Sequence, residues 1–196
     1  MHSAASRAAD RPRRLVVGIT GATGIAYGVR ALEMARKAGV ETHLVVTPAG
    51  QQTRAYETDL QARDLAAMAD VAYRPADVGA AIASGSFRTD GMLVAPCSIR
   101  TLSAIAYAGN DNLLTRAADV TLKERRRLVL MVRETPLTHG HLRAMTAATE
   151  SGAVVMPPVP AFYLRPESVD DIVDHSVGRA LDLLGIEVPD LPRWGG

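Results

Sequence analysis

The sequence predicts a single α/β domain with a mostly parallel sheet. Short apolar runs alternate with helical patterns along the chain, as expected for repeated strand–helix–strand units. The runs are continuously apolar, which is typical of strands buried on both faces. A chain of 196 residues has room for one domain with a substantial core. Its 47% hydrophobic and 22% charged residues are ordinary for a globular protein and exclude disordered and fibrous classes.

In the first half of the chain, strands are expected at 15–20, 43–46 and 91–95. Gly39 ends a helix over 25–38, and Pro96 ends the third strand. The helical pattern over 49–69 is interrupted. A short helix is expected at 78–83, and another over 98–106.

In the second half, strands are expected at 128–132 and 153–156, the latter stopped by Pro157 and Pro158. Helical patterns cover 142–150 and a last segment that ends near Leu184. Ser168 caps that last helix, and Asp170 and Asp171 suit its positive end.

The two ends differ from the domain between them, residues 15–185. Residues 1–14 are small, polar and basic, and we expect a disordered arm that is neither a signal peptide nor a membrane anchor. The tail 186–196 carries the only tryptophan, Trp194, and is expected to pack on a neighbouring subunit. A single cysteine, Cys97, fits a reducing compartment, so the expected location is the cytoplasm. A net charge of +1 argues against nucleic-acid and membrane partners.

A glycine-rich turn follows the first strand and opens a helix, at Gly18, Gly21 and Gly24. Backbone N–H groups and the helix dipole hold phosphates in this setting. The spacing is not that of dinucleotide sites, and Thr47 stands where such a site places an acidic residue for the ribose. A hydroxyl there suits a mononucleotide, which favours FMN over NAD. The alternative is a tight turn without a ligand.

Residues 96–101 lie where the third strand meets a helix, at the edge where open α/β sheets bind ligands. Ser98, Arg100 and Thr101 offer donors for an anion or a flavin ring. Cys97 is expected to be a small buried group rather than a nucleophile. His139 and His141 are interpreted as exposed loop residues, and no metal is expected.

The segment 112–137 places charges around the strand at 128–132. Arg125, Arg126 and Arg127 are interpreted as solvated surface charges. Arg133 and Glu134 follow the buried strand directly, so we expect their side chains at the carboxyl edge of the sheet.

Seven motifs in this order resemble the UbiX-type flavin prenyltransferases, over residues 15–194. They are Gly21–Gly24, Ala83–Ser86, Pro96–Ser98, Leu114–Val120, Leu122–Arg126, Arg133–Leu137 and Pro160–Tyr163. The resemblance implies a Rossmann-like or flavodoxin-like three-layer fold and a dodecamer built from trimers. It implies that reduced FMN is joined at N5 and C6 to the dimethylallyl group of dimethylallyl monophosphate, with release of phosphate. The product, prenylated FMN, serves a partner decarboxylase.

The resemblance also implies site residues. The implied FMN contacts are Gly21, Ala22, Thr23, Thr47, Ser98, Ile99, Arg100, Thr101 and Arg133. The implied substrate contacts are Arg116, Lys123, Glu134, Tyr163, Arg179 and Trp194. The implied catalytic residues are Glu134, Glu57, Thr23, Lys123 and Arg116.

Charge supports this assignment, because cations offset the charge of a phosphate monoester and of the leaving phosphate. A carboxylate beside a phosphate is repulsive unless protonated, so Glu134 is expected to give a proton to the departing phosphate. Glu57, with a hydroxyl of the glycine turn, is expected to move protons around the flavin. The chain departs from the family pattern at Thr23, Arg100 and Phe87, where serine, lysine and, in some members, tryptophan occur.

Three alternatives stay open. One is an FMN-dependent decarboxylase of cysteine derivatives, which needs a histidine base that no histidine here is well placed to supply. The second is a non-catalytic flavin carrier, and the third is a decarboxylase of aromatic acids.

Overall fold

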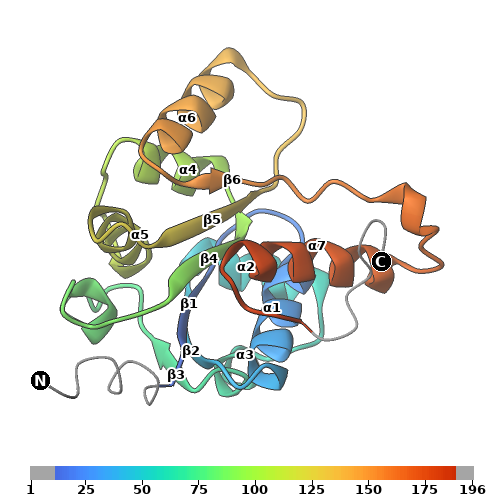
Figure 1. Ribbon diagram of the computed structural model, residues 1–196, viewed down its shortest axis with the longest axis horizontal. Coiled ribbons are helices and arrows are strands. Elements are labelled where there is room, and N and C mark those ends of the chain that lie inside the picture. The colour runs from blue at the N-terminus through green and yellow to red at the C-terminus, as the bar shows by residue number, and fades with distance from the viewer. Residues whose placement is uncertain (1–11, 189–196) are drawn as a thin grey trace, which may run out of the picture.

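The computed structural model describes residues 12–188, and within them six parallel strands form one sheet in the order β3-β2-β1-β4-β5-β6 (Figure 1). The strands are β1 (Arg14–Ile19), β2 (Glu41–Val46), β3 (Val71–Tyr73), β4 (Gly91–Cys97), β5 (Arg127–Val132) and β6 (Val154–Val155). The chain builds outward from β1 to β3, then crosses back to β4 and builds the other way. The topological switch point therefore lies between β1 and β4, at their carboxyl ends.

Helices cover both faces of this sheet (Figure 1). They are α1 (Ile25–Lys37), α2 (Pro48–Glu57), α3 (Ala62–Ala67), α4 (Ile99–Ala106), α5 (Leu113–Lys123), α6 (His139–Glu150) and α7 (Val169–Leu183), with 3₁₀ turns η1 (Ala81–Ala83) and η2 (Phe162–Leu164). On one face α1, α3 and α7 pack with Leu15, Val17 and Ile19. On the other, α4, α5 and α6 pack with Val16 and Met92. The alternation along β1 follows from the two-residue period of a strand.

The helix α1 lies very close to the sheet because it carries a glycine at the contact. A Cβ atom at Gly28 would lie 2.5 Å from the Ala95 carbonyl oxygen and 2.6 Å from the Ile19 side chain. Real Cβ atoms do not approach that closely, so only glycine permits this packing. The start of α1, and the glycine turn before it, are thereby held against the ends of β1 and β4.

The predicted parallel α/β domain in three layers is confirmed, and the predicted strands are found within two residues. β3, α5 and η2 were not predicted. β3 is only three residues long and lies at the sheet edge, with Val71 and Ala72 exposed, so its apolar run is too short to signal a strand. Residues 49–69 form two helices, α2 and α3. The cap of α7 is as expected, since the Ser168 hydroxyl accepts from the Asp171 amide at 3.1 Å.

Two predictions about charged or polar residues are wrong. His139 and His141 lie in the first turn of α6 rather than in a loop, because Thr138 caps that helix and the His141 ring accepts from the Thr138 amide at 3.2 Å. Arg126 is not a solvated charge. Its side chain is 15% exposed and donates to the carbonyl oxygens of Gly85 at 2.7 Å and Phe87 at 2.8 Å.

Candidate functional site

A cavity of about 390 Å³ opens at the carboxyl edge of the sheet, beside the switch point. Five of the nine residues predicted to bind the cofactor line it, namely Gly21, Thr47, Ser98, Arg100 and Thr101. The other four predicted contacts do not line the cavity itself. Ala22, Thr23 and Ile99 are next to lining residues in the sequence, and Arg133 follows the neighbouring strand β5. The structure thus brings together the three loops that the sequence singled out separately.

Eight further lining residues were not predicted: Pro48, Ala49, Pro75, Ala76, Ala104, Asp111, Asn112 and Thr115. Those from Pro75 onward come largely from the elements that the sequence analysis missed, the end of β3 and the start of α5. A signal for α5 was present. Asn112 stands three residues before Thr115, and together they form a capping box ahead of an apolar periodic run.

Three helix N-termini within residues 12–188 border the cavity. Asn112 caps that of α5, and hydroxyl groups cap those of α2 and α4. The Thr47 hydroxyl accepts from the Gly50 amide at 3.1 Å at the start of α2. The Ser98 hydroxyl accepts from the Thr101 amide at 3.3 Å and donates to the Thr101 hydroxyl at 3.2 Å at the start of α4. Both α2 and α4 therefore present the positive end of the helix dipole, with a hydroxyl beside it, at the cavity wall.

The N-terminus of α1 is different, because a carboxylate of this chain occupies it. Glu57 accepts from the Gly24 amide at 2.9 Å and from the Ile25 amide at 2.8 Å, and the Thr23 hydroxyl donates to it. The Gly24 and Ile25 amides are therefore occupied by Glu57 in the isolated chain, and the contacts expected at Gly21, Ala22 and Thr23 stay predictions.

The same contacts set the charge of Glu57. Partial burial raises the pKa of this carboxyl, but the hydrogen bonds from Thr23, Ile25 and Gly24 and the nearby Arg133 charge outweigh burial, so the net pKa is lowered. Glu57 is thus ionised near neutral pH in the isolated chain. Its link to the Thr23 hydroxyl joins two residues that the resemblance assigns to proton movement.

Arg133 and Glu134 lie just beyond the carboxyl end of β5, as expected. The Arg133 amide donates to the Cys97 carbonyl at 3.0 Å, which ties this segment to the end of β4. Glu134 is exposed, and its carboxylate accepts from the Thr135 amide at 3.0 Å. Cys97 is fully buried, and burial raises the pKa of its thiol far above the usual range, which agrees with a structural rather than nucleophilic role.

Arg116 and Lys123 lie on α5, seven residues apart and so on one face of the helix. At 1.5 Å of rise per residue they are separated by roughly 10 Å along its axis. Arg116 pairs with Asp119 at 3.2 Å, and Lys123 lies 3.7 Å from Glu124. Both side chains are at least one-third exposed.

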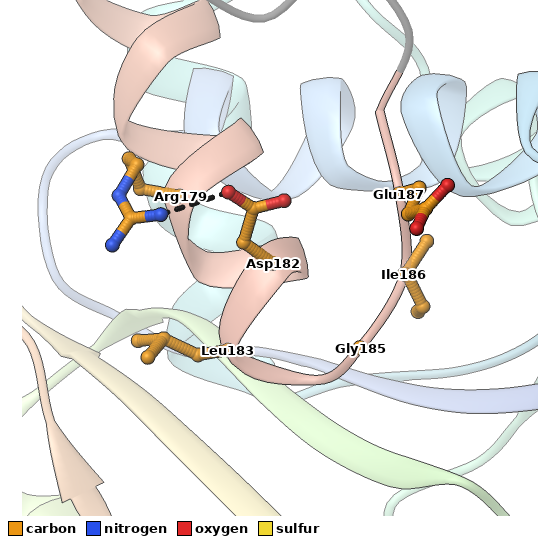
Figure 2. Close-up of a pocket in the computed structure, with 6 residues that line it drawn as sticks. All are labelled: Arg179, Asp182, Leu183, Gly185, Ile186 and Glu187. Carbon is orange, nitrogen blue, oxygen red and sulfur yellow. Dashed lines mark hydrogen bonds and ion pairs between the residues drawn. The ribbon is translucent and has the colours of Figure 1, made fainter. Parts of the chain in front are cut away.

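Tyr163 and Arg179 belong to the opposite helical layer. Tyr163, in η2, meets the His175 ring of α7 edge-on at 6.3 Å. Arg179 donates to Asp182 at 2.8 Å beside a pocket of about 340 Å³ at the end of α7, where Figure 2 shows the two side chains facing one another. One chain therefore does not gather the predicted phosphate-binding residues into a single site. Trp194 lies outside the described residues, as do residues 1–11 of the predicted arm (1–14) and residues 189–196 of the predicted tail (186–196). Arg14, which the prediction placed in the arm, begins β1.

Phe87, one of the departures from the family pattern, does not line the cavity. Its ring meets His43 edge-on at 5.1 Å and lies under the Arg14 guanidinium at 4.9 Å. Across residues 12–188 no cluster of three or more histidine, cysteine or acidic side chains is arranged to hold a metal ion. In the same range, no helix has both the length and the apolar character needed to cross a bilayer.

Comparison with known proteins extends the resemblance over nearly the whole chain. Residues 3–181 match the family model Flavoprotein. The flavin prenyltransferase UbiX of Neisseria meningitidis serogroup B is 58% identical over 184 residues, covering 94% of this chain and 97% of that protein. The chain belongs to the UbiX flavin prenyltransferase family. The family expected from the motifs is confirmed.

Solved structures of UbiX proteins agree. The crystal structure of AnUbiX (PadA1) in complex with FMN and dimethylallyl pyrophosphate has a TM-score of 0.93 and 50% identity, covering 95% of this chain and 99% of that one. A dodecameric FMN-dependent UbiX-like decarboxylase from Escherichia coli O157:H7 has a TM-score of 0.90 and 52% identity, covering 93% and 100%. The FMN-dependent cysteine decarboxylase TvaF, 19% identical with a TM-score of 0.64, shares the fold alone.

Proposed function

We propose that this protein is a flavin prenyltransferase that joins the dimethylallyl group of dimethylallyl monophosphate to N5 and C6 of reduced FMN and releases phosphate. The observation that carries the proposal is the cavity at the switch point, where Gly21, Thr47, Ser98, Arg100 and Thr101 converge from three separate loops. When bound, reduced FMN supplies the nucleophilic ring atoms that accept the prenyl group.

The cavity fits FMN in size and chemistry. Its volume of about 390 Å³ lies within the range of small-molecule sites. Its wall combines apolar residues such as Pro48 and Pro75 with hydroxyl groups and the N-termini of α2 and α4. Apolar surface suits a flavin ring, and helix N-termini with hydroxyl groups suit a phosphate. Ala22, Thr23, Ile99 and Arg133 complete the proposed contacts.

Cations drive the departure of phosphate in this proposal. Arg116, Lys123 and Arg179 bind the phosphate of the prenyl donor and stabilise the charge that grows as the C–O bond breaks. Glu134 gives the leaving phosphate a proton, and Tyr163 donates a neutral hydrogen bond. Glu57, already hydrogen-bonded to the Thr23 hydroxyl, accepts and returns protons beside the flavin.

The site is completed between subunits. Arg116 and Lys123 lie on one face of the sheet and Tyr163 and Arg179 on the other, so they meet only when neighbouring chains are packed together. A dodecamer, as in the E. coli relative, supplies such contacts. The tail with Trp194 is proposed to close the site from a neighbouring subunit.

The product is proposed to leave for a partner decarboxylase that uses prenylated FMN, and the reaction is proposed to take place in the cytoplasm. Anaerobic incubation with reduced FMN and dimethylallyl phosphate, followed by mass spectrometry of the flavin, tests the reaction. The expected result is a flavin heavier by one dimethylallyl group. Running monophosphate and pyrophosphate donors in parallel identifies the preferred donor. An unchanged flavin mass with both donors contradicts the proposal.

The same assay separates the alternatives. A flavin carrier binds FMN and leaves it unmodified, and a decarboxylase of cysteine derivatives or aromatic acids consumes its acid without a prenyl donor. A cysteine-derivative decarboxylase is disfavoured, because no histidine within residues 12–188 lines the cavity. Arg116→Ala and Glu134→Gln are expected to lower turnover and leave FMN bound.

A further inference from the structure

We propose that Thr20 is a positioning residue for the flavin site, whose hydroxyl holds the glycine turn and the Ser98–Thr101 turn at a fixed separation. The proposal rests on the proposed function, since it assumes that the cavity between these turns binds FMN. Thr20 is 1% exposed and stands at the end of β1, directly before Gly21. It does not line the cavity itself.

The hydroxyl of Thr20 bridges two atoms of the neighbouring strand end. It donates to the Pro96 carbonyl oxygen at 2.8 Å and accepts from the Ser98 amide at 2.8 Å. The Thr20 amide also donates to the Pro96 carbonyl, at 3.2 Å. Three hydrogen bonds thus join the residue that follows β1 to the segment that leads into α4.

Backbone pairing alone is sparse at this point, where the Thr20 amide bonds the Pro96 carbonyl, and the Thr20 side chain adds to it. The paired residues of β1 and β4 end at Gly18 and Val94. Two residues further on, Pro96 has no N–H group with which to continue the ladder. The threonine hydroxyl adds two bonds here, because it donates to the Pro96 carbonyl and accepts from the Ser98 amide at the same time.

These hydrogen bonds of Thr20 affect the shape of the cavity. Gly21 follows Thr20 in the chain, and the Ser98 amide donates to the Thr20 hydroxyl, so both cavity walls are one residue or one bond from Thr20. The Cys97 carbonyl, between the two bonded residues, accepts from the Arg133 amide at 3.0 Å. The Thr20 contacts therefore set the spacing across the switch point at which a flavin would lie.

Valine at this position keeps the shape of threonine and removes the hydroxyl. Thr20→Val is expected to weaken FMN binding by about tenfold or more, from the cost of leaving the Ser98 amide unpaired. Thr20→Ser keeps the hydroxyl and is expected to bind FMN within about threefold of the wild type. Thr121→Val is the matched control, since the buried Thr121 hydroxyl bonds the Ala117 carbonyl at 2.7 Å within α5, away from the cavity.

The experiment measures the dissociation constant of FMN by titration, and the melting temperature of each flavin-free variant at one protein concentration. If Thr20 positions the flavin site, both Thr20→Val and Thr121→Val lower the melting temperature, and only Thr20→Val loses FMN affinity. Should Thr20→Val be insoluble, Thr20→Ala takes its place with the same expectation. Wild-type FMN affinity in the valine or alanine variant, or a serine variant as weak as valine, overturns the inference. A wild-type protein that binds no FMN instead refutes the proposed function.

Discussion

Gly21 lies where two walls of the cavity meet, and its lack of a side chain is what lets them meet. A Cβ atom at Gly21 would lie 2.4 Å from the Ala49 Cβ atom, and both residues line the cavity. The sequence indicated Gly21 as part of a ligand-binding turn. The structure adds a second reason for glycine, the close approach of the turn before α1 to the start of α2.

Gly21→Ala is expected to push these walls apart and lower FMN affinity by about tenfold, because overpacking a close contact costs about 1–3 kcal/mol. Titration of FMN against the purified variant measures this. Gly79→Ala is the control, since a Cβ atom there meets only the Asp77 carboxylate at 3.9 Å. Equal affinity in the two variants would contradict the argument.

His43 makes stability depend on pH. Burial lowers the pKa of its imidazole below the ordinary 6.5, although the hydrogen bond to Glu41 acts in the opposite direction. The unfolded chain therefore takes up a proton first as the pH falls. The contribution of His43 to stability is fully present above pH 6.5 and is lost as the pH falls below that value.

His43→Gln is expected to flatten the fall in melting temperature between about pH 7.5 and about pH 5. Glutamine offers a donor to Glu41 and an acceptor to Tyr73, the roles of a neutral imidazole, and does not titrate. Some pH dependence remains through His175, whose pKa is lowered by burial and by Arg179. His139→Gln, on the exposed start of α6, should leave the profile unchanged. If the melting temperature of His43→Gln falls with pH as steeply as that of the wild type, His43 is not the cause of the pH dependence.

At the scale of elements, Arg126 connects the segment before β4 to the junction of α5 and β5. Its guanidinium bonds two carbonyl oxygens, of Gly85 and Phe87, and Phe87 in turn packs on His43 of β2. Neighbouring arginines look alike in sequence. Arg126 differs from Arg125 in the folded protein, because residues 85–87 pack beside the junction and bond to Arg126.

Arg126→Met is expected to lower the free energy of unfolding by about 2 kcal/mol, because two carbonyl oxygens lose a charged donor. In a chain of this size that loss corresponds to a melting temperature lower by roughly 4–8 °C. Arg125→Met removes an exposed charge one residue away and should change the melting temperature little. Similar losses in both variants would show that the hydrogen bonds of Arg126 are not the cause.

For the whole molecule, the proposed division of the site between subunits makes assembly a condition of activity. Twelve chains of 20.8 kDa amount to about 250 kDa, the mass expected from light scattering of a dodecamer. A monomer that transfers prenyl groups at full rate would contradict the shared site.

Mixed assemblies test the sharing directly. Arg116→Ala and Arg179→Ala are each expected to be nearly inactive alone. If the two residues reach one site from different chains, random co-assembly in equal amounts restores about a quarter of wild-type activity, because each position is intact in half of the chains. No recovery in verified mixed oligomers would place both residues at the same chain's site.

Local pattern was enough for five of the six strands described, for the cap of α7 and for three of the loops that line the cavity. Continuous apolar runs mark β1, β4 and β5, and parallel strands bring their following loops to one edge, so Gly21, Thr47 and Ser98 were predictable as neighbours. β3 was not predicted, because three partly exposed edge residues are too few to show an apolar period. Missing β3 and α5 also meant missing Pro75, Asn112 and Thr115 in the wall.

The residue pattern was sufficient for the fold class, the family and the edge of the sheet at which the cavity opens. Which polar groups are free to meet a ligand depends on how the chain packs. Glu57 occupies the amides of the glycine turn from 33 residues away, and Thr20 reaches Ser98 across 78. Packing also sets Arg116 and Arg179 on opposite faces of the sheet. Apolar periodicity is a property of residues that are close in the sequence. A hydrogen bond between residues far apart in the sequence exists only after packing has brought their atoms together.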